Sequence, residues 1–332
     1  MITKELLKMS KGAKSALLIL ALLLLPAAAI LRTDKSIDQK WYEDFAQAQK
    51  MASQQGKDLL VDFTGSDWCS WCWRLEEEVF SQDHFKKKAP EDFILVKLDF
   101  PRDKSKMSQE IIEQNEKLAR EYPFPGFPTI YLMDADSRPY AQTGYQQGGP
   151  EKYVEHLSKL HAVRVRRDEF IAQTRDKFVV ENGERKKVKV EPLKKARLLD
   201  QALSIMDDEI VAEFYVNEVQ KIIELDADNA AGLKSKYQLR LRLNEAQKVL
   251  NSRDYKKAVE MMDAVIKDLN LIGETAQKVL YIKCEGLFYL QDMKALEKGL
   301  REAYQAAPKG KLVPDIKKKF ERFFPDKDIG KK

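Results

Sequence analysis

The sequence predicts an α/β domain followed by an all-α helical domain. Between residues 35 and 162, two short apolar runs and a later strand–turn–strand pattern alternate with helical periodicities, an order typical of α/β folds. From about residue 164 helical patterns replace the strand patterns. The length of 332 residues suits two modest domains, and 44% hydrophobic with 33% charged residues is typical of a globular chain.

The first 31 residues have the pattern of an export signal. Four lysines precede an apolar run from Ala16 to Leu31, which is shorter than the roughly 20 residues that span a bilayer. Pro26 and the alanines after it resemble a cleavage site. We expect a cleaved secretory signal over residues 1–31, with an uncleaved membrane anchor as the alternative. Both place the remaining chain in the periplasm or cell envelope, where disulfides persist.

The α/β domain, residues 35–162, can be predicted element by element. "DQKWYEDFAQAQKMASQQGKD" carries Trp41, Phe45, Ala48 and Ala52 at helical spacing. "LLVDFT" and "FILVKLDF" are apolar enough to be buried strands, whereas "WRLEEEVF" and "SQEIIEQNEKLAREY" have helical periodicity. "PTIYLMDADSRPYAQTGY" predicts a strand, a turn and a second strand, and Gly-Gly-Pro then marks the start of a final helix.

Residues 163–196 are predicted to be a linker and residues 197–326 a helical-repeat domain. The linker contains one hairpin signal, Asn182-Gly183. Further on, two segments align with Asp254 on Asp292, a spacing near 38 residues. This pattern resembles tetratricopeptide repeats, whose usual period is about 34 residues. A generic helical bundle is the alternative interpretation.

The net charge of +5 is small for this length. The basic stretches "ERKKVKVEPLKK" and "DIKKKFERFF" are not interleaved with aromatic residues in a nucleic-acid-binding pattern. We therefore expect no nucleic-acid partner, and a membrane contact only through the N-terminal segment if it stays uncleaved.

Cys69 and Cys72 lie in "GSDWCSWCW", between a predicted strand and a predicted helix. A cysteine at a helix N-terminus is stabilised as the thiolate by unpaired N–H groups and the positive end of the helix dipole. A spacing of two residues brings the second sulfur within disulfide range. The thiolate of Cys69 could attack a substrate disulfide, and Cys72 could then resolve the mixed disulfide.

Two other interpretations of this pair are a zinc site and a structural disulfide. Zinc needs four ligands, commonly in two paired sets, but the third cysteine, Cys284, lies in the helical region and histidines are few. A disulfide that closes so short a loop gains little from constraining the unfolded chain. Redox chemistry is therefore favoured, with no metal and no other cofactor expected.

Residues 35–162 resemble a thioredoxin-fold domain. "VDFTGSDWCSWC" is similar to the family's strand with its buried aspartate and Trp-Cys-x-x-Cys, although the approach loop has one extra residue. "VKLDF" resembles the strand with the buried lysine, "YPFPGFPTIYLMDADSRP" the strand entered through a cis-proline, and Gly144 the late glycine. The sequence pattern "FTGSDWCxWC…LEEEVF" is especially similar to that of periplasmic thioredoxin-like proteins related to the C-terminal domain of the membrane disulfide reductase.

This resemblance implies the residue roles. Cys69 would be the nucleophile and Cys72 the resolving cysteine, forming a redox disulfide. Asp62 would lie beneath them and accept the proton from Cys72, since burial raises the pKa of a carboxyl group. Lys97 would pair with Asp62, unless it is an edge-strand lysine that extends to solvent.

The resemblance also implies residues that contact the substrate. Pro128 would be cis, leaving the backbone of Phe127 free to pair with an extended substrate peptide. Trp68 would cover the site as an aromatic lid. For Trp71, and for Trp73 beside it, substrate contact and surface packing are both open.

Three features depart from the family pattern or lie outside it. Ser70-Trp71 replaces the Gly-Pro of cytosolic thioredoxins and lacks the histidine of strongly oxidising members, which predicts a more reducing pair. Phe127 is bulkier than the usual residue before the proline, which could narrow the substrate range. Cys284 has apolar helical neighbours, so a buried, inert thiol is expected, with an intermolecular disulfide or regulatory thiol as the alternative.

The sequence thus predicts an exported thiol–disulfide oxidoreductase, a reductase or isomerase that acts on protein thiols and disulfides. An upstream redox partner protein would exchange electrons with it, and the helical repeats would recruit a substrate or protein partner. The alternative is an envelope interaction protein in which the helical repeats bind partners and the thioredoxin domain is a peptide-binding module.

Overall fold

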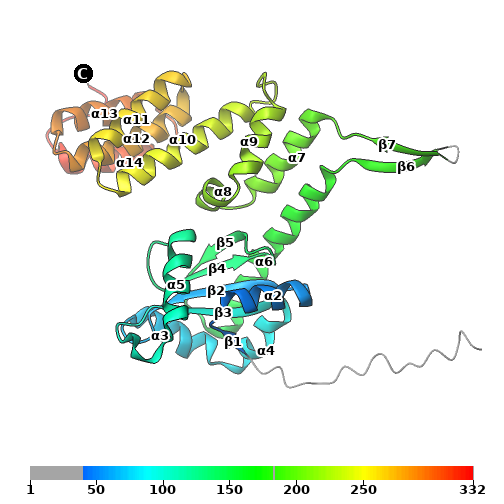
Figure 1. The fold of residues 1–332 in the computed structure, drawn as a ribbon. Coiled ribbons are helices and arrows are strands. Elements are labelled where there is room, and N and C mark those ends of the chain that lie inside the picture. The colour runs from blue at the N-terminus through cyan, green and yellow to red at the C-terminus, as the bar shows by residue number, and fades with distance from the viewer. Residues whose placement is uncertain (1–39, 182–183, 332) are drawn as a thin grey trace, which may run out of the picture. The chain divides into compact units, whose positions relative to one another are not determined.

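A five-stranded mixed sheet organises the first part of the chain (Figure 1). The computed structural model describes residues 40–181 and 184–331, and those from Trp41 onward belong to one compact unit. The strand order is β1-β3-β2-β4-β5, with β2 parallel to β3 and antiparallel to β4. The strands are β1 (Trp41–Tyr42), β2 (Asp58–Thr64), β3 (Phe93–Asp99), β4 (Thr129–Met133) and β5 (Pro139–Thr143).

Two groups of helices flank this sheet. The first group contains α2 (Phe45–Gln55) and α5 (Gln109–Glu121), which are joined because the Gln114 side chain accepts from the backbone N–H of Phe45 and donates to the carbonyl of Glu43. The second group contains α3 (Ser70–Leu75), η4 (Glu76–Phe80), α4 (Asp83–Asp92) and α6 (Gly149–Gln173). A short 3-10 turn, η5 (Lys104–Lys106), precedes α5.

Every residue of the central strand β2 is buried. Because side chains alternate across a strand, Asp62 and Phe63 point to opposite faces of the sheet. Phe63 packs against Phe124 at 4.6 Å between ring centroids. Asp62 has Glu76 and Tyr153 as electrostatic neighbours and so faces η4 and α6. The strand thereby delivers one carboxyl group to the helix that follows the cysteines.

The prediction that Trp41 belongs to the first helix is wrong. The side chain of Asp44 accepts from the N–H of Gln47 and caps α2, so the helix begins only at Phe45. Trp41 instead pairs with Leu95 on the sheet edge, and its ring packs 5.0 Å from that of Phe80. Helix α4 was not predicted as a separate element, because its charged sequence buries only Phe85 and Ala89.

The C-terminal part is helical, as predicted. Its helices are α7 (Pro192–Ser204), α8 (Asp208–Phe214), α9 (Val216–Leu225), α10 (Leu233–Asn251), α11 (Tyr255–Asp268), α12 (Gly273–Tyr289), α13 (Met293–Ala306) and α14 (Val313–Phe323). The predicted boundary at residue 162 falls inside α6. The predicted linker contains an exposed hairpin of β6 (Lys177–Glu181) and β7 (Glu184–Val188), while its tip at 182–183 lies outside the described residues.

The turns before α11 and α13 have the same backbone geometry 38 positions apart. Arg253 and Gln291 both have positive φ, at 68° and 59°. The next residue, Asp254 or Asp292, then caps its helix through its side chain. The self-similarity seen in the sequence therefore corresponds to two helix pairs, α10–α11 and α12–α13, joined by the same turn.

Helices α7 to α9 share one hydrophobic core with the sheet, whereas α11 to α14 pack in separate clusters. The ring of Phe214 lies 5.8 Å from Tyr122 and 6.0 Å from Tyr131. Buried Arg167 on α6 donates to Asp134 in the β4–β5 turn at 2.9 Å and also to the hydroxyl of Tyr215. The sheet and the first C-terminal helices are thus held together by both apolar and charged contacts.

Within residues 40–181 and 184–331, no helix has both the length and the apolar character needed to cross a bilayer. The predicted signal or anchor, residues 1–31, lies outside the described residues.

Candidate active site

Cys69 and Cys72 form a disulfide at the start of α3, with their Cα atoms 5.2 Å apart. Cys69 is the N-cap residue, and its Sγ accepts from the N–H of Cys72 at 3.1 Å. Both residues are 5% exposed. A sulfur at this position receives the backbone N–H groups and the helix dipole that favour a thiolate. Cys69 therefore has the surroundings of a nucleophile once the disulfide is reduced.

The loop before the cysteines is held by polar contacts that the sequence did not reveal. The carboxylate of Asp67 accepts from the N–H groups of Arg102 and Asp103, both at 2.9 Å, and these bonds lower the pKa of Asp67. Ser66 is anchored in the same way to Asp99, through its backbone N–H at 2.9 Å. Gly65 is required here because an added Cβ would lie 2.5 Å from the Trp68 ring.

Asp62 is buried, and its Oδ1 has no hydrogen-bond partner among the described residues. Burial raises the pKa of Asp62 to about 8, with the charge of Lys97 opposing the shift and that of Glu76 adding to it. A carboxyl group with such a pKa can accept and return a proton near neutral pH.

Lys97 forms its ion pair with Glu76 rather than with Asp62. Its Nζ lies 3.1 Å from Oε2 of Glu76 and 5.4 Å from the ring centroid of Trp41. Lys97 stands opposite Asp62 in the β2–β3 register, but its ammonium group reaches the more exposed carboxylate, which avoids a full loss of hydration. The expected direct pair with Asp62 is therefore replaced by a longer-range interaction, and Glu76 is a site residue that the sequence did not reveal.

The peptide bond between Phe127 and Pro128 is cis, as the resemblance predicts. Trp68 contacts this loop edge to face, with 5.2 Å between its ring and that of Phe127, and its Nε1 donates to the carbonyl of Phe100 at 2.8 Å. The structure thus brings the residue before Cys69 against the residue before the cis-proline.

Trp71 and Trp73 are about half exposed beside the cysteines, at 52% and 50%. Trp71 lies 5.4 Å from the ring of Tyr145, whose hydroxyl donates to Glu78. Trp73 is fixed by its Nε1, which donates to the carbonyl of Ser66 at 2.6 Å. Trp71 and Tyr145 therefore present an aromatic rim next to the redox pair, and Tyr145 had no recognisable sequence signal.

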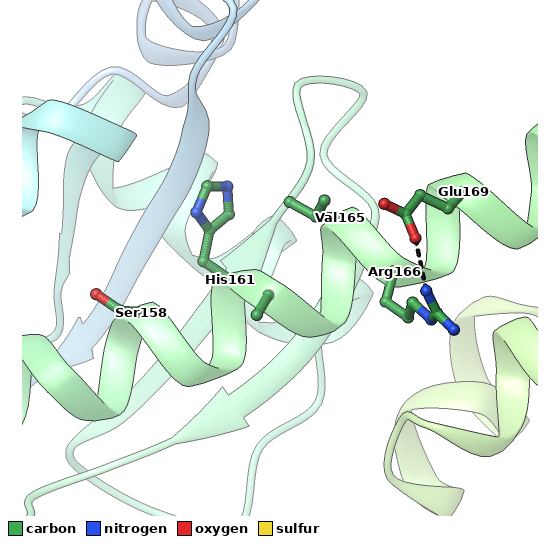
Figure 2. Close-up of a pocket in the computed structure, with 6 residues that line it drawn as sticks. Ser158, His161, Val165, Arg166 and Glu169 are labelled. Atoms are coloured by element: carbon green, nitrogen blue, oxygen red, sulfur yellow. Dashed lines mark hydrogen bonds and ion pairs between the residues drawn. The ribbon is translucent and has the colours of Figure 1, made fainter.

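The third cysteine and His161 of α6 lie away from the redox pair. Cys284 is buried in the helical region, and burial raises its pKa to about 12. A separate pocket along α6, shown in Figure 2, includes His161 and an Arg166–Glu169 ion pair of 3.0 Å. Among the described residues no group of three or more His, Cys, Asp or Glu side chains is arranged to hold a metal ion.

Replacing Asp62 with asparagine is expected to stabilise the fold and to slow disulfide reduction about tenfold or more. The native carboxyl group keeps its proton up to about pH 8, whereas the unfolded one loses it near pH 3.8. The free energy of unfolding therefore falls as pH rises between these values. Asparagine removes that loss, and we expect a gain of about 2 kcal/mol at pH 8 that disappears near pH 4.

Chemical denaturation of the oxidised protein at pH 4, 6 and 8 measures this effect. The expected gain in the free energy of unfolding is well below what the two pKa values alone would give, because the asparagine amide would also be buried without a partner. Asp136→Asn, which removes an exposed carboxylate, is the matched control. Its difference in stability from the wild type should not show this increase between pH 4 and pH 8. A gain that is equal at all three pH values would contradict the assignment of Asp62.

Comparison with known proteins identifies relatives of the first part of the chain. The model of the thioredoxin-like domain family matches residues 45–161. Disulfide bond reductase DsbH of Chlamydia pneumoniae is 31% identical over 123 residues, covering 37% of this chain and 74% of the relative. Thioredoxin-related protein DsbJ of the same organism is 27% identical over 138 residues, covering 42% of this chain but only 38% of the relative.

Similar solved structures include DsbH oxidoreductase, at 29% identity and a TM-score of 0.35, over 37% of this chain and 84% of that one. The C-terminal domain of Neisseria meningitidis DsbD in its oxidised form is 18% identical, with a TM-score of 0.25, over 34% of this chain and 90% of that one. The family model ends at residue 161, before the helices that follow α6.

Proposed function

The chain belongs to the thioredoxin-like family of thiol–disulfide oxidoreductases, and on this basis we propose that it is an exported reductase of protein disulfides. The observation that carries the proposal is the Cys69–Cys72 disulfide at the start of α3, preceded by Trp68, which packs on Phe127 of the cis-proline loop. Buried Asp62, on the strand before the pair, has a raised pKa. Electron transfer from the cysteine pair to the substrate, rather than the reverse, is supported by the relative named disulfide bond reductase. It is also supported by Ser70-Trp71, which places no cationic imidazole beside the nucleophile.

The proposed reaction has two sulfur-transfer steps. The thiolate of Cys69 attacks one sulfur of the substrate disulfide, the substrate S–S bond breaks, and one substrate thiolate leaves. Asp62 takes the proton from the Cys72 thiol, and the new thiolate attacks Sγ of Cys69 and releases the second substrate thiolate. The substrate gains two electrons and the pair is oxidised to the Cys69–Cys72 disulfide. A redox partner protein with a dithiol would then return two electrons to the pair.

Export is supported by the N-terminal sequence, and an oxidising compartment supplies the protein disulfides that such an enzyme would reduce. The competing proposal, an interaction protein that uses the helical region, predicts binding without turnover.

The test is insulin reduction by catalytic amounts of the protein with dithiothreitol as electron source, together with the reduction potential of the pair. We expect turnover, and a potential more negative than the roughly −180 mV of protein disulfide isomerase. Protein with both thiols alkylated is the control and should be inactive. A potential at or above that value would contradict the reductase direction, and absence of turnover would favour the interaction protein.

A further inference from the structure

A cleft of about 890 Å³ lies between the cis-proline loop and the helical region. Pro128 and Phe124 line it from the loop, Gly144 lines it from the end of β5, and residues of α8 and α10 line it from the other side. This volume is within the range of roughly 300–1,000 Å³ that is typical of ligand clefts. The part of the wall formed by α8 and α10 lies outside the region that matches the thioredoxin-like family.

Two ring contacts link the lining of this cleft to the residue beside Cys69. The Trp68 ring, next to Cys69, packs on Phe127, and Phe127 packs on Phe124 with 5.0 Å between ring centroids. A substrate peptide that reaches Cys69 alongside the loop at Phe127 would therefore extend past Phe124 and Pro128 into the cleft.

Helix α10 presents amide side chains to the cleft. Asn244, Gln247 and Asn251 line it, and their spacing places them on one face of the helix. Gln247 already donates to Oδ1 of Asn251 at 3.0 Å. Each amide offers both a donor and an acceptor, which an extended backbone requires because its N–H and C=O groups lose water on binding.

Helix α8 and its cap make the same cleft acidic. Asp207, Glu209 and Glu213 line it against a single cation, Lys248, which pairs with Glu213. Among the described residues, no ion pair engages the side chains of Asp207 or Glu209. The nearby guanidinium of Arg240 is engaged by Asp208 at 2.7 Å and also donates to the carbonyl of Asp207. The cleft is thus negative in a chain whose net charge is +5.

We propose that this cleft, here called the α8–α10 cleft, binds the extended segment that flanks the reactive cysteine of the substrate polypeptide. It favours segments that carry lysine or arginine. Apolar contacts at Phe124 and Pro128 and amide contacts from α10 hold the segment, and Asp207 and Glu209 select its charge. The proposal rests on the proposed function and adds a substrate preference to it.

Two synthetic peptides test the preference. Each contains one intramolecular disulfide in an identical loop, followed by three lysines in one peptide and three glutamates in the other. We expect the reduced wild-type protein to have a kcat/KM about tenfold higher for the lysine peptide at low salt, and a smaller ratio at high salt. In the double variant Asp207→Asn, Glu209→Gln the ratio should fall to about twofold or less. Asparagine keeps the N-cap preference at the start of α8.

The matched control is Glu274→Gln, Glu321→Gln, which removes two exposed carboxylates outside the cleft, one of them in the first turn of α12. Its ratio should equal that of the wild type. Equal rates for both peptides with wild-type protein would overturn the proposed role of the α8–α10 cleft, and so would an unchanged kcat/KM ratio in the double variant. Both outcomes would leave the reductase proposal intact. If neither peptide is reduced, the proposed function itself fails and this inference with it.

A second measurement locates the bound segment directly. The lysine peptide, trapped as a mixed disulfide on Cys69 in a Cys72→Ser variant, should slow amide hydrogen exchange over residues 207–214 and 244–251. Protection confined to the cis-proline loop would exclude the helical wall from the binding site.

Discussion

Replacing Cys69 with serine is expected to abolish insulin reduction, a loss of at least about 10³-fold. The hydroxyl group at this position ionises far less readily than a thiol, so no nucleophile forms at the start of α3. Replacing Cys72 with serine should leave the first attack intact but remove the resolving thiol. The substrate then stays attached to Cys69 as a mixed disulfide, which mass spectrometry of the non-reduced protein detects.

The third cysteine is the matched control for both variants. Cys284 is buried and the pKa of its thiol is raised to about 12, so Cys284→Ala should retain turnover and form no substrate adduct. If Cys284→Ala were inactive while Cys69→Ser retained activity, the assignment of the redox centre would be wrong.

Replacing Arg167 with methionine is expected to lower the free energy of unfolding by about 3 kcal/mol. The guanidinium is 1% exposed and contacts Asp134 at 2.9 Å and Asp168 at 2.7 Å. Its loss leaves the buried carboxylate of Asp134 facing an apolar side chain. The penalty is kept moderate because Asp134 also accepts from the N–H groups of Asp136 and Arg138, and because Nε of Arg138 lies 3.5 Å from its Oδ2. Thermal denaturation should show a decrease in Tm of about 5 °C.

The neighbouring residue supplies the control. Arg166 forms an exposed ion pair with Glu169, so Arg166→Met should change the stability by less than about 1 kcal/mol. Adding Asp134→Asn to Arg167→Met should recover part of the loss, because it removes a buried charge that has lost its shortest ion pair. Equal Tm values for the Arg166 and Arg167 variants would contradict a role for Arg167 in joining the sheet to the helices.

Much of the site could be predicted because its signals are local. The spacing of Cys69 and Cys72, the apolar strand around Asp62 and the proline at 128 are each readable within a few residues. The partner of Lys97 could not be predicted in this way, because the choice between Asp62 and Glu76 depends on how far each carboxylate stays hydrated.

Arg167 shows the limit of pattern reading most clearly. It lies in the charged run "VRVRRDEF", where a solvated helix face is the ordinary expectation. Its burial depends on Asp134 and Tyr215, which are 33 and 48 residues away in the sequence. Trp41 was misassigned for a related reason: its helical spacing was real, but the cap at Asp44 and pairing with β3 decided its conformation.

The continuous helix α6 has a consequence for how this protein can be divided. Tyr153 and Leu157 in its first half and Arg167 in its second half are all buried, so one rigid element belongs to both parts. A fragment cut at residue 162, where the family likeness ends, would uncover the rings of Tyr122 and Tyr131 that Phe214 covers. A fragment that keeps this core intact extends through α9 and into α10, where Tyr237 belongs to the same core. The thioredoxin-like domain and the first C-terminal helices share this core, so transferring either one to another protein would expose apolar surface that the other now buries.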